Sequence, residues 1–388
     1  MQLKLLFIYL LFSMKIQAND SLLIPKLFQS LLNKQQLEDN FFKKGSFTSF
    51  RQYAKKEYLE ADNNVFYTAL ISYTLNHLKP YLTVDEKIVV DTITNRAKKV
   101  FENYRNAKGR LSYNFWPTTN GKIFFPNNSL LSLFKNSLAL PDDLDDTGII
   151  LSSMNLSDSI ASIAHQIMQQ FVNNKSGTIK NTYPKYSKYK AYSTWYGEKM
   201  PIDFDFGVHC NILSFVNQYN LQWSSADSAT YQLILKMIDD KLYLTNPDFI
   251  SPYYDKSSIL LYHIARLMQT KNLPELELKR KQFIAEAREL YTKSNSTLEK
   301  IILQTCLLKW NDDVELTKQP EIHQLDDLYT TEFVYYTGHL FAHLNYSVKT
   351  IANQLPITQF KWFSSAFNDC LLLENLVLKY RRNLTHGH

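Results

Sequence analysis

The apolar residues of this 388-residue chain recur mostly three and four positions apart, the spacing of helices that bury one face. The runs at 65–75 and 88–93 show this spacing most clearly. The same pattern predicts further helices at 158–173, 204–219, 226–240, 257–270, 275–293, 296–309, 331–345 and 362–381. Short interruptions carrying Pro, Asn or Gly separate these segments, and none has the composition of a flexible interdomain linker.

About ten to twelve helices joined by short loops predict an all-α fold of paired antiparallel helices. We find no strict repeat, which favours a closed ring, a single α/α toroid, over an open array. The chain also has only nine glycines, which argues against a fold rich in sheet. The exception is the stretch at 111–128, where two aromatic-rich segments flank Asn120-Gly121, a strong turn signal. We expect a small hairpin or a long ordered loop there.

The first residues have the pattern of a secretory signal. Lys4 precedes an apolar run from Leu5 to Met14, and the segment ends on the small residue Ala18. A run of about ten residues is half of the roughly 20 needed to cross a bilayer, which favours a cleaved signal. A retained N-terminal anchor is the alternative. We therefore predict a signal peptide at 1–18, a single domain at 19–388, and a periplasmic or secreted protein with no stable membrane span after cleavage.

Charge and cysteine content exclude several classes of function. The formal net charge is +6, and removing Lys4 and Lys15 with the signal leaves about +4, too small a surplus for a nucleic-acid-binding protein. Three widely separated cysteines, an odd number, do not form a disulfide framework, although one pair remains open. Motifs for nucleotide binding or a serine nucleophile are absent.

The strongest chemical signal is an acidic segment directly before an apolar helical run. Asp142, Asp143, Asp145 and Asp146 lie within five residues. One interpretation is that they cap the helix and complement its dipole. The other is functional: clustered carboxylates hold a proton at unusually high pH, or they bind a divalent cation.

Asp143-Leu144-Asp145-Asp146-Thr147 resembles the D-x-D-D-T motif of class II terpene cyclases, in which the middle carboxylic acid starts a carbocation cascade. The resemblance implies an α/α toroid, an isoprenoid substrate, Asp145 as general acid, and Asp143 and Asp146 as groups that tune and orient it. The class I metal pattern D-D-x-x-D also fits, but its second motif is not completed by the segment from Asn368 to Glu374. We therefore expect no cofactor, with a divalent cation as the alternative.

Other loops before predicted helices carry acids and aromatic rings. Asp203 and Asp205 open one such helix, and either could face Asp145 across a shared cavity. His339 and His343 would share one face of the helix predicted at 331–345, without a complete metalloprotease motif. The residues that we expect to bind substrate are Trp116, Phe125, Trp195, Tyr196, Tyr253, Tyr254 and Arg266.

Three functions remain open from the sequence. The first is an exported enzyme of terpene-cyclase type that acts on a small isoprenoid by acid catalysis from Asp145. The second is an exported glycan-processing enzyme in which Asp145 and Asp203 or Asp205 form a carboxylate pair. The third is a non-catalytic binding or effector protein. The character of the pocket separates them, since an isoprenoid requires a dry aromatic site and a glycan an open polar groove.

Overall fold

The computed structural model describes residues 22–53, 58–119, 122–123, 140–197, 200–312, 333–353 and 355–381. The predicted signal peptide and Phe125 lie outside these ranges.

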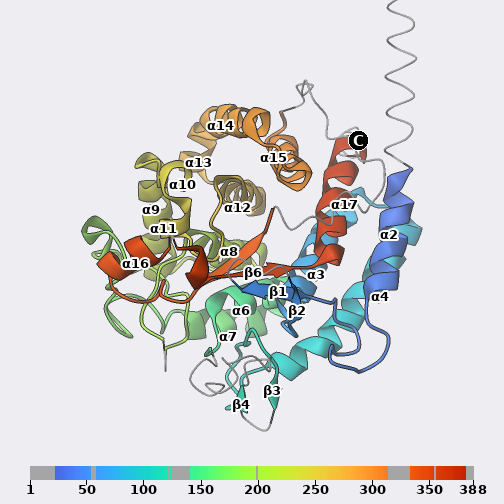
Figure 1. Cartoon of the computed structure of the whole chain (residues 1–388), viewed down its shortest axis with the longest axis horizontal. Coiled ribbons are helices and arrows are strands. Elements are labelled where there is room, and N and C mark those ends of the chain that lie inside the picture. The colour runs from blue at the N-terminus through green and yellow to red at the C-terminus, as the bar shows by residue number, and fades with distance from the viewer. Residues whose placement is uncertain are drawn as a thin grey trace, which may run out of the picture.

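Six long helices pack in a closed cycle, in which each contacts the next along the chain and the last contacts the first (Figure 1). Their apolar residues face all directions, as expected for helices surrounded by protein. Every residue of α6 is buried, and in α8 only Gln218 is not. The cycle consists of α3 (Phe66–Leu78), α6 (Leu144–Ser153), α8 (Phe206–Gln218), α12 (Ser257–Thr270), α15 (Thr297–Lys309) and α17 (Ser365–Arg381).

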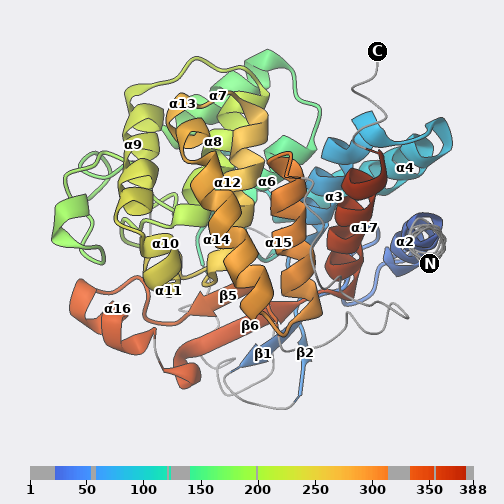
Figure 2. The same ribbon diagram turned by 90° about the horizontal axis from the view of Figure 1, so that it is seen from above.

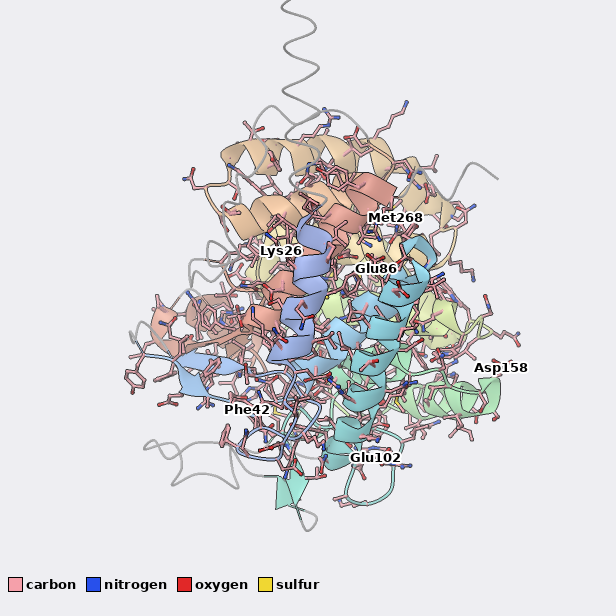
Figure 3. All side chains as sticks on the ribbon, turned by 90° about the vertical axis from the view of Figure 1, so that its right-hand side faces the viewer. Lys26, Phe42, Glu86, Glu102, Asp158 and Met268 are labelled. Atoms are coloured by element: carbon pink, nitrogen blue, oxygen red, sulfur yellow. The ribbon has the colours of Figure 1, made fainter. Side chains whose placement is uncertain are left out.

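Several other helices pack outside this cycle. Helix α14 buries a single stripe, Phe283, Ala287 and Tyr291, at the four-residue spacing of a surface helix. In Figure 3, α2 with Lys26 lies beside α4 with Glu86, and these two helices contact α17 and α3 respectively. The long outer helices are α2 (Leu23–Lys34), α4 (Val84–Phe101), α7 (Asp158–Met168), α9 (Ser225–Asp239) and α14 (Arg280–Lys293).

Short helical segments connect these elements. The α-helical ones are α10 (Leu242–Thr245), α11 (Pro247–Ile250), α13 (Pro274–Leu278) and α16 (Tyr346–Ala352). The 3₁₀ turns are η1 (Lys79–Tyr81), η2 (Glu102–Tyr104), η4 (Pro184–Tyr186) and η6 (Pro356–Thr358).

An antiparallel sheet of four strands crosses one end of the helical cycle (Figure 2). Its order is β2 (Glu60–Ala61), β1 (Phe50–Tyr53), β6 (Gln359–Phe363) and β5 (Tyr336–His339). Helix α3 begins soon after β2 and α17 directly after β6, so the sheet lies at the end where these two helices start.

The chain is mostly helical as predicted, but this four-stranded sheet was not predicted. The described part of the helix predicted at 331–345, residues 333–345, is not helical, because Tyr336 to His339 pair with β6 and alternate between partly exposed and buried positions. The helix predicted at 362–381 starts only at Ser365, after β6. The helix predicted at 275–293 is divided into α13 and α14.

The predicted hairpin at 111–128 is confirmed in its paired strands, β3 (Thr118–Thr119) and β4 (Lys122–Ile123). Cys210, Cys306 and Cys370 are all free and buried. Among the described helices, none is both long enough and apolar enough to cross a membrane.

Candidate active site

The acidic segment lies between two extended stretches of chain at the start of α6. The amide of Asp143 donates to the carbonyl of Tyr113 at 3.3 Å, and the amide of Leu144 donates to the carbonyl of Thr194 at 2.7 Å. On the same side, the amide of Tyr196 donates to the carbonyl of Asp142 at 3.1 Å. Backbone hydrogen bonds from distant parts of the chain therefore fix where the four carboxyl groups point.

Asp142 has a structural role. Its carboxylate accepts hydrogen bonds from Asn106 Nδ2 and Ser112 Oγ, both at 2.5 Å, and its Oδ2 lies 3.2 Å from the guanidinium of Arg110. Arg110 also packs over the ring of Tyr196, 4.7 Å from its centroid. These neighbours hold the buried carboxyl group of Asp142 in place through two hydrogen bonds and an ion pair.

Asp143 is the N-cap of α6, since its Oδ1 accepts the amide of Asp146 at 2.6 Å. Burial raises the pKa of both carboxyl groups, that of Asp143 to about 7 and that of Asp146 well above its usual value. A hydrogen bond between the two side chains favours the proton on Asp146. We therefore expect a neutral Asp146 beside Asp143, the group that becomes anionic first.

Asp145 points toward α8 and the loop before α12, which follow α6 in the cycle. Its Oδ1 accepts from Asn211 Nδ2 of α8 at 2.8 Å, and its Oδ2 accepts from Tyr254 Oη, in the loop before α12, at 2.6 Å. Only 4% of the residue is exposed. Burial and the nearby charge of Asp143 raise the pKa of Asp145 to about 7, although both hydrogen bonds act in the opposite direction.

These two effects together suit a proton donor. Burial keeps the carboxyl protonated near neutral pH, while two donors are already placed to stabilise the carboxylate that remains after the proton leaves. No reorganisation of water is needed for that stabilisation.

Gly207 allows Tyr254 to reach Asp145. It lies in the first turn of α8, and a Cβ at this position would be 2.3 Å from Cδ2 of Tyr254, far inside van der Waals contact. The ring of Tyr254 is also packed 4.3 Å from that of His263. The close approach of the ring to the α8 backbone therefore requires glycine.

We expect Gly207→Ala to destabilise the protein by about 1–3 kcal/mol, because the new methyl group displaces the ring of Tyr254. Denaturant unfolding measures this loss. Gly148→Ala is the matched control, since it lies in α6 of the same site and its Cβ would meet its nearest neighbour only at 3.9 Å. Equal stability of the two variants would contradict the proposed contact.

Aromatic rings gather beside the carboxyl groups. Tyr336 of β5 lies at the centre of this group. Burial raises the pKa of its hydroxyl well above the usual value, and the nearby charges of Asp146, Asp145 and Asp143 add to this increase. It retains part of its surface exposed. The rings around it are Phe66 at 4.2 Å, Trp362 at 5.5 Å, Tyr254 at 5.6 Å, Phe115 at 5.7 Å and Tyr253 at 6.2 Å.

Asp205 is tied up in local structure. It is the N-cap of α8, where Oδ1 accepts the amide of Val208 at 3.1 Å and the hydroxyl of Ser251 at 2.6 Å. Its Oδ2 accepts the amide of Tyr253 at 3.2 Å. Burial raises the pKa of Asp205 to about 7, and Asp145 adds to this increase, so the two acids are near each other.

Asp203 connects the site to α16. It accepts from Asn181 Nδ2 at 2.6 Å and from Tyr253 Oη at 3.3 Å, and it lies 4.0 Å from the buried ammonium of Lys349. Burial raises its pKa despite the attraction of Lys349. Tyr253 donates a hydrogen bond to each of Asp203 and Asp205, so both acids lie beside the candidate site.

The other predicted residues separate into two groups. Trp195 is near the acids, with its ring 6.0 Å from that of Tyr253 and its indole nitrogen buried without a partner. Trp116 is further away, where its Nε1 donates to Asp62 at 3.1 Å. Arg266 lies in α12, with its guanidinium 4.1 Å from the ring centroid of Tyr73, and its charge acts to lower the pKa of Asp145.

The prediction that His339 and His343 share one helix face is wrong. His339 ends strand β5, and His343 lies in the turns that follow, so the two do not share a helix face. Nor do the described ranges contain any group of three His, Cys, Asp or Glu side chains placed to hold a metal ion.

Asn211 and Tyr336 were not predicted from the sequence as residues of the site. Asn211 is a polar residue in the middle of the apolar helix α8, a signal that could have been found. Tyr336 was hidden because its segment was predicted as a helix.

The sequence matches no protein-family model and no curated protein. Two solved structures are similar in fold. One is a ligand-free variant of type II terpene cyclase MstE from Scytonema, with a TM-score of 0.56 and 11% identity, covering 93% of this chain and 98% of that one. The other is a variant of the same cyclase in complex with its substrate, geranylgeranyl dihydroxybenzoate, with a TM-score of 0.55 and 11% identity over 93% of this chain and 99% of that one. This chain therefore has the fold of type II terpene cyclases.

Proposed function

We propose that this protein is an acid-initiated isoprenoid cyclase with Asp145 as its general acid. One observation carries the proposal: the carboxyl group of Asp145, almost fully buried and with its pKa raised to about 7, is held by Asn211 and Tyr254 beside a group of aromatic rings. The motif around Asp145 and the fold of the chain support the same conclusion.

The reaction begins with proton transfer from Asp145 to an alkene or epoxide at one end of the substrate. The O–H bond of the acid breaks, a C–H or O–H bond forms on the substrate, and a carbocation results. Neighbouring double bonds attack this cation in turn and close rings, and loss of a proton from carbon ends the cascade. In this proposal the aromatic group beside Asp145, which includes Tyr336, Phe66 and Trp195, supplies the rings that stabilise the positive charge.

We also infer that the closed cycle of six helices is the inner ring of an α/α toroid, and that residues 1–18 direct export. The exterior position of α2, α4, α9 and α14 supports the toroid. Export rests on the N-terminal sequence alone.

A glycan-processing site is less well supported. Such a site needs a second carboxyl group able to act as base or nucleophile. Three donors occupy the oxygens of Asp205, and Asp203 is held by an amide, a phenol and an ammonium group. The aromatic character of the neighbouring wall also suits an apolar substrate better than a sugar.

The proposal is tested by incubating the purified protein with linear isoprenoids that end in an alkene or an epoxide, free or joined to an aromatic acid. Cyclised products are identified by mass spectrometry and NMR. Cyclisation of at least one member supports the proposal. Cleavage of an oligosaccharide panel, with no isoprenoid product, would contradict the proposal and identify a glycan-processing enzyme instead.

Activity should depend on pH in a defined direction. Because the acid must be protonated, kcat/KM is expected to fall as the pH rises through about 7, the pKa of Asp145. Tyr254→Phe removes a hydrogen bond that lowers this pKa, so the alkaline limb of its profile should move to higher pH while kcat decreases. A limb that stays in place, or moves to lower pH, would contradict the role of Tyr254.

A further inference from the structure

The segment that joins β5 to β6, residues 340–358, exposes many large apolar side chains; residue 354 is not described. Ile351 is 66% exposed and Ile357 65%. The full set is Phe341, Leu344, Tyr346, Val348, Ile351, Leu355 and Ile357. We call residues 340–358 the β5–β6 segment. Such a concentration of exposed apolar residues is characteristic of an interaction surface.

A loop rich in lysine lies directly against this segment. We call residues 175–190 the lysine loop; its lysines, all exposed, are Lys175, Lys180, Lys185, Lys188 and Lys190. The amide of Tyr346 donates to the carbonyl of Lys180 at 2.9 Å, and the ring of Tyr346 lies 5.5 Å from that of Tyr183.

Within the two segments themselves, all charged side chains are positive. No acidic residue occurs between Asp158 and Glu198, nor anywhere in the β5–β6 segment. Lys185 is paired with Asp240, which follows the last residue of α9, whereas Lys180 and Lys190 are exposed lysines of the same loop. An apolar segment bordered by lysines and tyrosines complements an anionic bilayer, in which acyl chains lie beneath negative headgroups.

The position of the β5–β6 segment connects this surface to the candidate site. Tyr336, at the centre of the aromatic group, lies in β5 only five residues before Phe341. Lys349 of α16 extends inward to Asp203. Figures 1 and 2 place α16 at the edge of the molecule opposite α2 and α4.

We propose that the β5–β6 segment and the lysine loop form a peripheral docking surface for an anionic lipid bilayer. The apolar side chains of α16 and its flanks enter the headgroup region, and the lysines contact the phosphate groups around them. This proposal does not depend on the cyclase function, and its test uses no turnover.

The test uses the full-length protein with a single reporter on this surface. Ile351→Cys carries an environment-sensitive fluorophore, and the three native thiols do not react because they are buried. Ile88→Cys is the matched control, since Ile88 is 59% exposed on α4 at the opposite edge. Both variants have the same N-terminal segment, so any lipid binding through that segment affects them alike.

With vesicles of phosphatidylcholine and phosphatidylglycerol, we expect the emission from position 351 to shift to the blue and to be quenched by spin-labelled lipid, with no change at position 88. Lys180→Gln combined with Lys190→Gln should weaken binding to these vesicles about thirtyfold. The proposal is overturned if position 351 does not respond, if pure phosphatidylcholine binds equally well, or if the lysine variant binds like the native protein. It is also overturned if the signal changes with protein concentration without lipid, which would identify contact between copies of this chain.

Discussion

Asp145→Asn is expected to reduce cyclisation by at least about a thousandfold. General acids contribute typically 10²–10⁴-fold to catalysis, and here the transferred proton generates the cation itself. The asparagine keeps the shape of the side chain and can still contact Asn211 and Tyr254, but it has no acidic proton. Product formation by the native and variant proteins, followed by mass spectrometry, measures the effect.

Two observations distinguish lost chemistry from lost structure. Asp142→Asn, which changes the neighbouring carboxylate paired with Arg110, should leave turnover per folded molecule nearly unchanged. Burial raises the pKa of Asp145 from its usual value to about 7, so the stability that the neutral acid contributes below about pH 4 is lost as the pH rises through 7. The stability of Asp145→Asn relative to native should therefore increase over that range. Similar turnover in native and Asp145→Asn proteins would disprove the role of Asp145.

Glu374→Gln is expected to destabilise the protein by about 3–5 kcal/mol, because it removes one partner of a buried ion pair. Glu374 lies in α17, where one oxygen accepts from Lys309 Nζ at 2.7 Å and the other from the hydroxyl of Tyr262. The variant leaves Lys309 as a buried cation without its counter-charge. Urea unfolding at neutral pH measures the loss of free energy.

The exposed pair of Glu289 and Lys293 provides the control, and Glu289→Gln should cause no measurable change. Burial acts to raise the pKa of Glu374, but Lys309 and Tyr262 lower it below its usual value. Its stabilising contribution is therefore present above the pKa of the unfolded state and disappears as the pH falls. A Glu374→Gln variant as stable as the native protein at neutral pH would show that the pair contributes little.

The sequence predicts the helices of the cycle well because each buries apolar residues at helical spacing. The helix predicted at 257–270 coincides with α12. The sheet was missed because its pairing joins strands from opposite ends of the chain, such as Phe50 with Phe363, and no local pattern encodes such a contact.

The candidate site was predicted only in part, because local sequence patterns do not encode contacts between distant parts of the chain. The acidic segment is a local feature and could be found by inspection. The partners that determine the chemistry of Asp145 lie 66 and 109 residues away in sequence, at Asn211 and Tyr254. Tyr254 was expected to bind substrate, whereas the structure places its hydroxyl on the acid itself.

The most direct test of acid initiation is the isotopic composition of the product formed in D₂O. Asp145 exchanges its acidic proton with solvent, and the initiating step transfers that hydrogen to the substrate. When an alkene is protonated, one deuteron is added to carbon and one proton is later lost, so each product molecule should contain one deuterium. A diphosphate attached at the far end of the substrate should be retained in the product. With an alkene substrate, a cyclised product without carbon-bound deuterium, or one formed with release of diphosphate, would contradict initiation by Asp145.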